Sequence, residues 1–437
     1  MRTLRLSMAL IQDAFRQLVH GGKLYWGWVA FLCVLVAVGA QAYAEQLEHG
    51  LIVTNMRDPV SWGFYIGNFT FLVGVAAAAV VLIIPAYIYH WKPIKEIAIV
   101  GEMLAVAAII MCLLFVTVDI GRPERFLHLF PFVGRPNFPQ SLLSWDVLVL
   151  NAYLIINVLI TTHMLFRAYI GRKPSRFAMP LILLSIPAAV SIHTVTAFLF
   201  SALPSRPYWN AAILAPRFLT SAFCSGPAII LILLQLLRKF SDLKIKDEAI
   251  WKIAELMAYA MAINLFLFGA EVFRDFYSDT HEAIHYQYLF WGTHGHRSPI
   301  AIYTWFSVIA SVVAFLLFLV PRTRKNVITL NIGAVLIYMG VYIEKGVALV
   351  IPGFTPSVTG EIYEYEPSFI EFRVAAGVFA IGFLVFTALI KIATPIMLGR
   401  LRAKGITVTD DEQDEQDEQD EQDEPAPAAP GTAEAAT

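Results

Sequence analysis

Residues 62–90 read WGFYIGNFTFLVGVAAAAVVLIIPAYIYH and contain no Asp, Glu, Lys or Arg. An α-helix rises about 1.5 Å per residue, so roughly 20 apolar residues cross the hydrocarbon core of a bilayer. Inside that core every backbone N–H and C=O group needs an internal partner, which a helix supplies. This stretch therefore predicts a membrane-spanning helix.

Nine further stretches have a similar length and apolar character. The ten predicted spans are 25–44, 62–90, 96–118, 143–167, 178–200, 214–237, 250–273, 299–320, 326–351 and 370–397. The sequence thus predicts an all-α integral membrane protein with ten transmembrane helices, whose membrane domain covers residues 25–400.

The composition of the 437 residues agrees with a membrane protein, since 58% are hydrophobic and only 15% are charged. Soluble domains carry about 25% charged residues, so this composition excludes an ordinary soluble enzyme. Twelve of the 34 acidic residues follow Thr409, whereas all 32 basic residues precede it. The membrane domain is therefore basic, and residues 401–437 are predicted to be a disordered acidic tail. We expect contacts with membrane lipids and none with nucleic acid.

The N-terminal segment 1–24 lacks the apolar core and small-residue cleavage site of a signal peptide. Leucines at 4, 6, 10 and 18 alternate with arginines at 2, 5 and 16 in a helical pattern. Two interpretations stay open, a short helix on the membrane surface and an ordinary cytoplasmic leader.

Basic residues are unevenly divided between the two sides of the predicted spans. Counted with the adjoining span ends, the side of the termini and the even-numbered loops holds 22 Lys and Arg residues. The side of the odd-numbered loops holds ten, which include Arg217 and Lys345. Basic residues are retained in the cytoplasm. We therefore predict a multi-pass protein of a prokaryotic cell (inner) membrane with both termini in the cytoplasm.

The predicted outer loops are longer than the inner ones and rich in Pro, aromatic and acidic residues. They cover 45–61, 119–142, 201–213, 274–298 and 352–369. Such aromatic segments are atypical of flexible linkers. They predict an ordered docking surface for a partner on the outer side.

Ionisable side chains inside membrane spans are costly, so their depth is informative. Several gather near the outer leaflet. They are Asp119, Asp146, His193, Glu271, Glu344 and, in the loop 119–142, His128. A two-electron, two-proton reaction of a quinone needs such protonatable groups close to one membrane face. The alternatives are ion pairs of Asp119 with Arg122 and of Glu271 with Arg274, and a packing role for His193.

A second set lies toward the inner side, with Glu102 and Glu255 near inner helix ends and Asn264 near the middle of its span. These residues suggest an inner half-channel for protons, and pairing with Lys95 or Lys252 is the simpler explanation. In the span 214–237, Ser221 and other small residues allow either a flat ring or a neighbouring helix to approach closely.

Redox cofactors of the protein itself are not indicated. The three cysteines form no CxxC or CxxCH motif, and no two histidines inside spans lie at the same depth. We therefore expect no iron–sulfur cluster, no haem and no metal in this chain. Electrons then come from a partner or from a diffusible carrier.

At several of these positions the sequence resembles the NrfD/PsrC family of quinone-interacting membrane subunits. The similar segments are SWGFYIGNFTFLVGVAAAA at 61–79, DIGRPERFLHL at 119–129, SIHTVTAFLFS at 191–201, APRFLTSAFCSGPA at 215–228 and the region of Glu271. The segment YIEKGVALVIPGFTPSVTGEIYEYEPSFIE at 342–371 looks closest to the DsrP type, from the complex associated with sulfite reduction.

The resemblance implies that spans 2 to 9 form two four-helix bundles flanked by spans 1 and 10. It also implies a quinone near the outer face, no redox cofactor in this protein, and a periplasmic ferredoxin-like iron–sulfur subunit as partner. Other membrane and cytochrome subunits of a Dsr-type complex are expected as well, and menaquinone is the expected quinone. By position, six residues match family motifs, namely Asp119, Arg122, His128, Asp146, His193 and Glu271. Asn68 and Ser221 match as lining residues, and Glu344 matches through the DsrP-like segment and its depth.

Three functions follow as hypotheses. The first is the quinone-reactive subunit of a respiratory complex that oxidises or reduces quinone, with or without proton translocation. In it, His128 and His193 contact the ring, and Asp119, Asp146 and Glu271 handle protons. The second is a secondary transporter or proton channel, whose ionisable residues are expected near the midplane. The third is a membrane anchor for the iron–sulfur subunit.

Overall fold

The computed structural model describes residues 2–129, 132–176, 178–278, 283–293, 295, 297–356 and 361–403. Within this part of the chain, ten helices are long and apolar enough to cross a membrane. They are α2 (Lys23–His49), α3 to η2 (Phe64–Ile88), α6 (Ala98–Asp119), α7 (Leu142–Tyr169), α8 (Ala178–Ser201), α9 (Leu214–Phe240), α10 (Asp247–Tyr277), α12 (Ile300–Leu319), α14 to η4 (Val327–Val347) and α15 (Phe369–Met397). The predicted all-α fold with ten spans is confirmed.

Two spans contain π-helical turns that the sequence pattern did not reveal. The second span consists of α3 (Phe64–Ala76), α4 (Ala78–Ile83) and the π-turn η2 (Ile84–Ile88). The ninth consists of α14 (Val327–Tyr342) and the π-turn η4 (Ile343–Val347), and the predicted helix beyond it is replaced by turns. Side chains of the loop 202–213 bind backbone carbonyls just after η4, which removes the need for a further helical turn.

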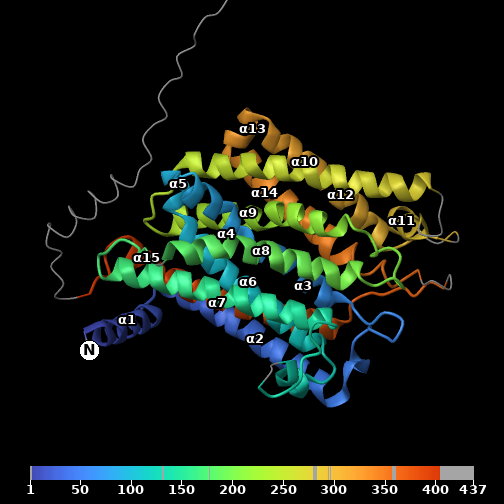
Figure 1. Ribbon diagram of the computed structural model, residues 1–437, viewed down its shortest axis with the longest axis horizontal. Coiled ribbons are helices and arrows are strands. Elements are labelled where there is room, and N and C mark those ends of the chain that lie inside the picture. The colour runs from blue at the N-terminus through green and yellow to red at the C-terminus, as the bar shows by residue number, and fades with distance from the viewer. Residues whose placement is uncertain are drawn as a thin grey trace, which may run out of the picture.

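The spans pack as two four-helix bundles. The first bundle contains α3 with α4, α6, α7 and α8, and the second contains α9, α10, α12 and α14. Helix α9 joins them because it also packs against α3, α4 and α8. Figure 1 shows the spans side by side, with α10 and α12 along one edge and α2 and α7 along the opposite edge. The expected pair of four-helix bundles is therefore present.

The remaining two spans flank the first bundle. Helices α2 and α15 pack against each other, and α15 also packs against α6. A Cβ atom on Gly39 would lie only 2.6 Å from the Cα of Gly377. Glycines at this crossing allow the two backbones to touch, as is common between membrane helices.

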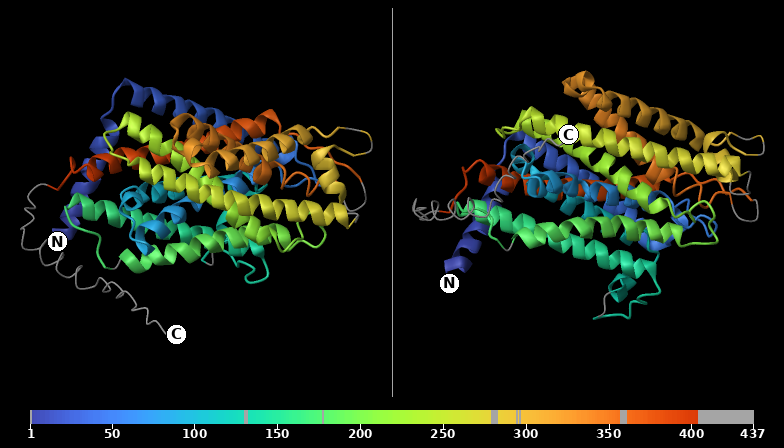
Figure 2. Two further views of the ribbon diagram at one scale, coloured as in Figure 1. Left: turned by 90° about the horizontal axis from the view of Figure 1, so that it is seen from above. Right: turned by 45° about the horizontal axis from the view of Figure 1, so that its top comes forward.

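The long loops and α1 lie at opposite ends of the helices (Figures 1 and 2). We call the end that carries α1 and residue 403 the α1 face, and the end that carries the loops 50–63, 120–141 and 202–213 and the helix α11 (Ala283–Phe290) the long-loop face. The α1 face also carries the short helices α5 (Lys92–Lys95) and α13 (Pro321–Lys325). Which face is cytoplasmic remains the prediction made from the basic residues.

The segment 2–19 forms the helix α1 (Arg2–Val19), in agreement with its periodic pattern. Its exposed apolar residues repeat at helical spacing, at Leu4, Met8, Ile11, Phe15 and Val19. The hydroxyl of Tyr169 donates to Asp13 over 2.8 Å, and that of Tyr25 donates to the carbonyl of Leu18 over 3.0 Å. Helix α1 is thus attached to α7 and α2 with one apolar stripe exposed, as a helix on a membrane surface requires.

The long-loop face is built from packed segments. Besides α11 it contains two 3-10 helices, η1 (Leu51–Val53) and η3 (Pro123–Leu129). Four aromatic rings of this face, Trp62, Phe200, Trp209 and Phe354, pack together with centroids 4.8–6.1 Å apart. The indole of Trp209 also donates to the carbonyl of Leu349 over 2.7 Å. The described parts of these loops are thus packed and ordered, as expected.

The predicted acidic tail begins at residue 401. Of it, only residues 401–403 are described, and the backbone N–H of Ala403 donates to the carbonyl of Tyr169 over 3.0 Å. The rest of the tail lies outside the described residues.

Candidate functional site

The second bundle contains a buried ionic cluster centred on Arg217, in the first turn of α9. One guanidinium nitrogen of Arg217 donates to Glu271 on α10, and another donates to Glu344 on η4 over 2.9 Å. The Arg217 side chain is only 9% exposed, and those of Glu271 and Glu344 are 4% and 13% exposed. Burial of three charges is tolerated because they pair with one another.

Asn264 and Thr220 extend this cluster toward the middle of the membrane. The amide of Asn264 donates to Glu344 Oε2 over 3.0 Å, and the hydroxyl of Thr220 donates to Asn264 Oδ1 over 3.4 Å. Both carboxylate oxygens of Glu344 therefore have a partner. We call Arg217, Thr220, Asn264, Glu271 and Glu344 the Arg217 cluster.

The π-turn η4 directs two adjacent residues, Glu344 and Lys345, toward different neighbouring helices. Glu344 contacts α9 and α10, whereas Lys345 donates to the carbonyl of Phe218 over 3.0 Å and lies 4.3 Å from the centre of its ring. The Lys345 side chain also approaches α3, since a Cβ atom on Gly74 would lie 3.3 Å from its Nζ. Lys345 thus places a buried amino group at the boundary between the bundles. π-Turns inside helices are often found at functional sites.

A small cavity adjoins the Arg217 cluster toward the long-loop face. It has a volume of about 20 Å³, and its lining includes Tyr208, Arg217, Phe268, Ser307 and Glu344. This volume is enough for a water molecule. The Nε atom of Arg217 is buried and has no acceptor among the described residues. One strong hydrogen-bond donor is therefore left over beside the cavity.

Tyr208 covers this cavity from the loop 202–213. Its hydroxyl donates to the carbonyl of Ala348 over 2.9 Å, and its ring stacks on His285 with centroids 5.4 Å apart. Burial raises the pKa of the Tyr208 phenol well above its ordinary value, and the neighbouring Arg217 opposes this. The phenol therefore keeps its proton at neutral pH and acts as a hydrogen-bond donor.

The first bundle holds its polar groups differently. Asp146 on α7 is 1% exposed and accepts a hydrogen bond from the hydroxyl of Thr196 on α8 over 2.7 Å. His193, also on α8, is fully buried, and its Nδ1 lies 2.7 Å from the carbonyl of Ala189. The Nε2 atom of His193 has no hydrogen-bond partner among the described residues. Asp146 and His193 are thus accessible to a ligand only if the bundle opens.

The three predicted residues of the segment 119–128 do not converge. Asp119 Oδ1 is buried without a partner among the described residues. Arg122 is exposed and lies 3.6 Å from Glu124, so the considered ion pair of Asp119 with Arg122 does not form. His128 is exposed on η3. The segment enters the long-loop face, where backbone turns direct Arg122 and His128 to solvent.

A second carboxylate near Asp119 is satisfied by neutral donors. Glu371, at the start of α15, accepts hydrogen bonds from the Tyr365 hydroxyl and from the backbone N–H groups of Asn55 and Ser368, the latter two over 3.0 Å and 2.8 Å. Its charge also lies within electrostatic range of Asp119. Glu371 therefore fixes the loop 50–63 to α15.

Asn68 and Ser221 are buried and already bonded. Asn68 Oδ1 accepts from the hydroxyl of Tyr342 over 2.9 Å, which connects α3 with α14. The Ser221 hydroxyl donates to the carbonyl of Arg217, one turn earlier in α9, over 2.7 Å. These two residues connect or line the boundary between the bundles.

The predicted inner path is not continuous. Glu102 is buried in the first bundle, and its Oε2 has no partner among the described residues. Glu255 lies at the α1 face, where it pairs with Lys252 over 3.5 Å and with Arg324 over 3.7 Å. Asn264 belongs to the Arg217 cluster. The three residues thus occupy three separate places.

Two residues of this region were absent from the sequence-based candidates. Arg217 was counted among the charges of the outer side, and the alternative partner considered for Glu271 was Arg274. In the structure Arg274 contacts Asp275 over 2.6 Å, and Glu271 pairs with Arg217. Lys345 was passed over beside Glu344, although a Glu-Lys pair inside a predicted span is itself a signal.

Metal ligation has no support in the described part of the protein. No three His, Cys, Asp or Glu side chains of these residues are grouped as metal ligands would be. The Arg217 cluster offers hydrogen-bond donors from Arg217 and Asn264 and carboxylates, Glu271 and Glu344, that can exchange protons.

The sequence matches the family model described as "Polysulphide reductase, NrfD" over residues 52–356, which is more than half of the chain. The protein belongs to the NrfD family. The matched region includes both bundles and the whole Arg217 cluster. The flanking helices α2 and α15 lie outside it.

Two of the curated relatives match most of the sequence, and a third matches part of it. It is 28% identical over 407 residues to a putative dimethyl sulfoxide reductase membrane subunit of Halobacterium salinarum, a match that spans 84% of this protein and 91% of the relative. It is 23% identical over 394 residues to the Hdr-like menaquinol oxidoreductase integral membrane subunit of Archaeoglobus fulgidus, with 86% and 95% spanned. It is also 29% identical over 186 residues to one of the polysulfide reductase polypeptides of Wolinella succinogenes, with 39% and 56% spanned.

Proposed function

We propose that this NrfD-family protein is the quinone-reactive membrane subunit of an oxidoreductase complex. The observation that carries the proposal is the Arg217 cluster, which joins two carboxylates and a guanidinium beside a cavity in the membrane. The names of the relatives, which include a menaquinol oxidoreductase subunit and a polysulfide reductase polypeptide, support a redox role. Quinone is the lipid-soluble substrate within reach of such a membrane protein.

The residues of the cluster can bind a quinone ring and exchange its protons. The unpartnered Nε–H of Arg217 is a donor for a ring oxygen. Glu344 and Glu271 can accept or deliver protons while Arg217 compensates their charge. Reduction of a quinone takes up two electrons and two protons, and oxidation of a quinol releases them. The cluster suits the proton exchange of either direction.

In this proposal the quinone enters from the bilayer between α10 and α12. The side chains of Leu265, Phe268 and Val308 line the cavity and are half-buried. A cavity of about 20 Å³ is too small for a quinone ring, so these side chains have to move when the ring enters. Phe268 lies 5.2 Å from the Arg217 guanidinium and is suited to stack against the ring.

We assign the electron partner to the long-loop face. Its packed aromatic loops offer a stable surface, and the Arg217 cluster lies in the part of the membrane nearest to it. An iron–sulfur subunit bound there would exchange electrons with the quinone. The exposed Arg122 and His128 then become contacts for this partner. The basic α1 face would be cytoplasmic and the long-loop face periplasmic.

The first bundle receives a secondary role in this proposal. Asp119, Asp146 and His193 are buried protonatable groups that could pass protons toward the long-loop face, with Asn68 and Ser221 at the boundary. Glu102 and Glu255 serve proton uptake from the α1 face in the same scheme. The proposal also includes menaquinone as the quinone. It further includes a DsrP-type complex with other membrane and cytochrome subunits, and a place in sulfur metabolism.

The decisive experiment uses the complex purified from its native membrane. We expect bound quinone in the lipid extract, and reduction of the partner's clusters by quinol that a quinone analogue inhibits. Glu344→Gln should lower this quinol-dependent rate at least about tenfold, since general acid–base catalysis contributes about 10²–10⁴-fold. Glu96→Gln, at the exposed α1 face where this carboxylate pairs with Lys246 over 3.2 Å, is the matched control and should retain the rate.

Three results would refute the proposal. The first is an unchanged quinol-dependent rate in a Glu344→Gln complex that assembles normally. The second is solute or proton transport by the isolated protein in liposomes without any redox partner, which would favour the transporter hypothesis. The third is a complex without bound quinone in which the analogue does not affect reduction of the partner's clusters. This result would favour the membrane-anchor hypothesis.

A further inference from the structure

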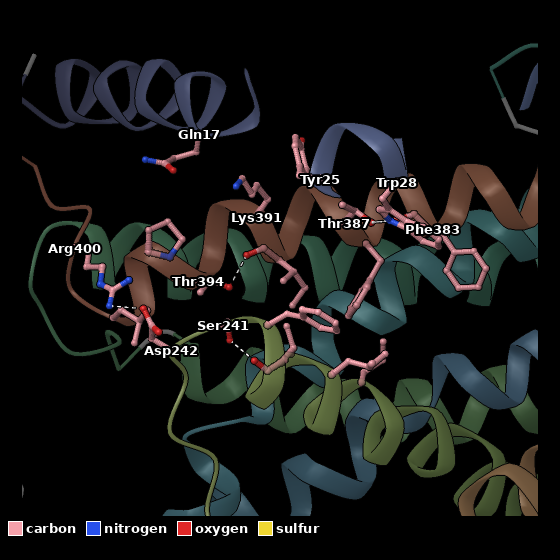
Figure 3. Close-up of a pocket in the computed structure, with 18 residues that line it drawn as sticks. Gln17, Tyr25, Trp28, Ser241, Asp242, Phe383, Thr387, Lys391, Thr394 and Arg400 are labelled. Atoms are coloured by element: carbon pink, nitrogen blue, oxygen red, sulfur yellow. Dashed lines mark hydrogen bonds and ion pairs between the residues drawn. The ribbon is translucent and has the colours of Figure 1, made fainter. Parts of the chain in front are cut away.

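A large groove lies at the α1 face, far from the Arg217 cluster. It has a volume of about 690 Å³ and lies between the ends of α2, α9 and α15, with α1 across its opening. Figure 3 shows Gln17 of α1 and Lys391 of α15 directed into the same end of this groove. Nothing in the proposed quinone reaction uses these residues.

The groove changes from apolar to polar along the helix axes. Toward the membrane centre it is lined by Trp28, Leu236 and Phe383, which are 43%, 46% and 46% exposed. Toward the α1 face it is lined by Gln17, Lys391 and the ion pair of Arg400 with Asp242. From Phe383 to Pro395 the lining of α15 extends about 18 Å, close to the thickness of one leaflet. The groove therefore has the polarity and length of a lipid molecule.

The polar end carries one cation whose charge is not compensated by a carboxylate. Lys391 forms no ion pair with any residue in the described part of the protein, and its ammonium group lies 4.7 Å from the centre of the Tyr25 ring. Asp242 does not supply the missing charge because it already binds Arg400 over 2.6 Å. An anionic group at this end would satisfy Lys391, and the amide of Gln17 is in place to donate a hydrogen bond to it.

We propose that this groove binds one anionic phospholipid of the leaflet at the α1 face. Its phosphate lies between Lys391 and Gln17, and its acyl chains lie along Leu236, Phe240 and Phe383. The lipid fills the space between α9 and α15 and connects the second bundle with the flanking helices. Such a lipid would add contacts between the second bundle and the helices α1, α2 and α15, which pack mainly against one another and against the first bundle.

The test uses the full complex reconstituted in nanodiscs of phosphatidylglycerol or phosphatidylcholine, followed by native mass spectrometry of the lipid that stays bound. Wild type should retain one phosphatidylglycerol that it does not retain from phosphatidylcholine. Lys391→Gln should weaken this retention about fivefold, the factor that corresponds to about 1 kcal/mol per basic residue at an anionic surface. Lys391→Arg should restore it.

Lys325→Gln is the matched control, because Lys325 lies at the same face with its ammonium 5.1 Å from the ring of Trp251 and outside the groove. It should retain the lipid.

Leu236→Trp fills the acyl-chain part of the groove while leaving Lys391 intact, and should lose the lipid even if Lys391→Gln fails to assemble. Equal retention in wild type and Leu236→Trp would overturn the proposal, and so would a bound molecule with the mass of a quinone. Both outcomes differ from a failure of the quinone site. That failure is measured separately, as the rate at which quinol reduces the partner's iron–sulfur clusters.

Discussion

The two four-helix bundles bury acidic residues in opposite ways. In the second bundle, Glu271 and Glu344 share the guanidinium of Arg217. In the first, Asp146 is held by the neutral hydroxyl of Thr196, and one oxygen of Glu102 has no partner among the described residues. An ion pair keeps its charges in the membrane, whereas a carboxyl with neutral partners has only hydrogen bonds to stabilise it.

In the proposed function, this difference gives the bundles different tasks. A fixed cation beside two carboxylates can stabilise negative charge that develops on a bound ring, which the first bundle cannot do. Lys345 lies where the bundles meet, bound to α9 and close to α3. The π-turn η4, which carries both Glu344 and Lys345, is therefore one of the contacts between the bundles, beside those of α9 with α3, α4 and α8.

Loss of the shared cation should have the largest effect. Arg217→Gln leaves two buried carboxylates facing each other, and removal of one partner from a buried ion pair costs about 3–5 kcal/mol. We expect a large fall in the yield of assembled complex and in its thermal unfolding temperature in detergent. Arg238→Gln removes an ion pair at the exposed end of the same helix and should cost at most about 1 kcal/mol. Equal stability of the two variants would show that the cluster is not ionic.

The contact between the bundles can be disturbed without touching a charge. Gly67 on α3 lies against Gly346 of η4, and a Cβ atom at position 67 would lie 2.2 Å from the Gly346 carbonyl oxygen. Gly67→Ala should shift η4, lower stability by about 1–3 kcal/mol and reduce the quinol-dependent rate of the assembled complex. The control is Gly269→Ala on α10, where no atom lies within 4 Å of the added Cβ. A normal rate in Gly67→Ala would mean that η4 has no part in the reaction.

In the first bundle we expect stability to depend on the hydrogen bond between Thr196 and Asp146 and not on an ion pair. Thr196→Val removes the donor to Asp146 and should cost about 1–3 kcal/mol, measured by thermal unfolding. The double variant Thr196→Val with Asp146→Leu removes both partners and should recover most of this loss. Asp146 has only a secondary role in the proposed function, so the quinol-dependent rate should stay within about threefold of that of the single variant, far from the loss of about 10²–10⁴-fold expected for a catalytic acid or base. A double variant that is stable but inactive would move the site to the first bundle.

Much of the fold could be predicted from the sequence because membrane helices depend on local composition. The apolar stretch at 62–90 and its nine counterparts each correspond to an observed span. The end of the ninth span could not be predicted, since the carbonyls after η4 are bound by Tyr208 and Trp209, which lie about 140 residues away in the sequence.

The candidate site was predicted in part. Glu271 and Glu344 were selected for their depth, and the structure brings them onto the same arginine. Asn264 was selected as well and joins them from the middle of α10. His128 and Arg122 carry the family motif, yet they are exposed, because a motif does not reveal the direction in which a loop turns.

The sequence by itself determined the ten spans, the acidic composition of the tail and the uneven distribution of basic residues. Each of these depends on residues that are close together along the polypeptide. Only the tertiary structure decided which charges meet. Arg217 and Glu344 are separated by 127 residues, and they come together because α9 and α14 pack in one bundle and η4 turns Glu344 toward α9. In a membrane the energy of a charge depends on its nearest partner, and that partner is set by helix packing.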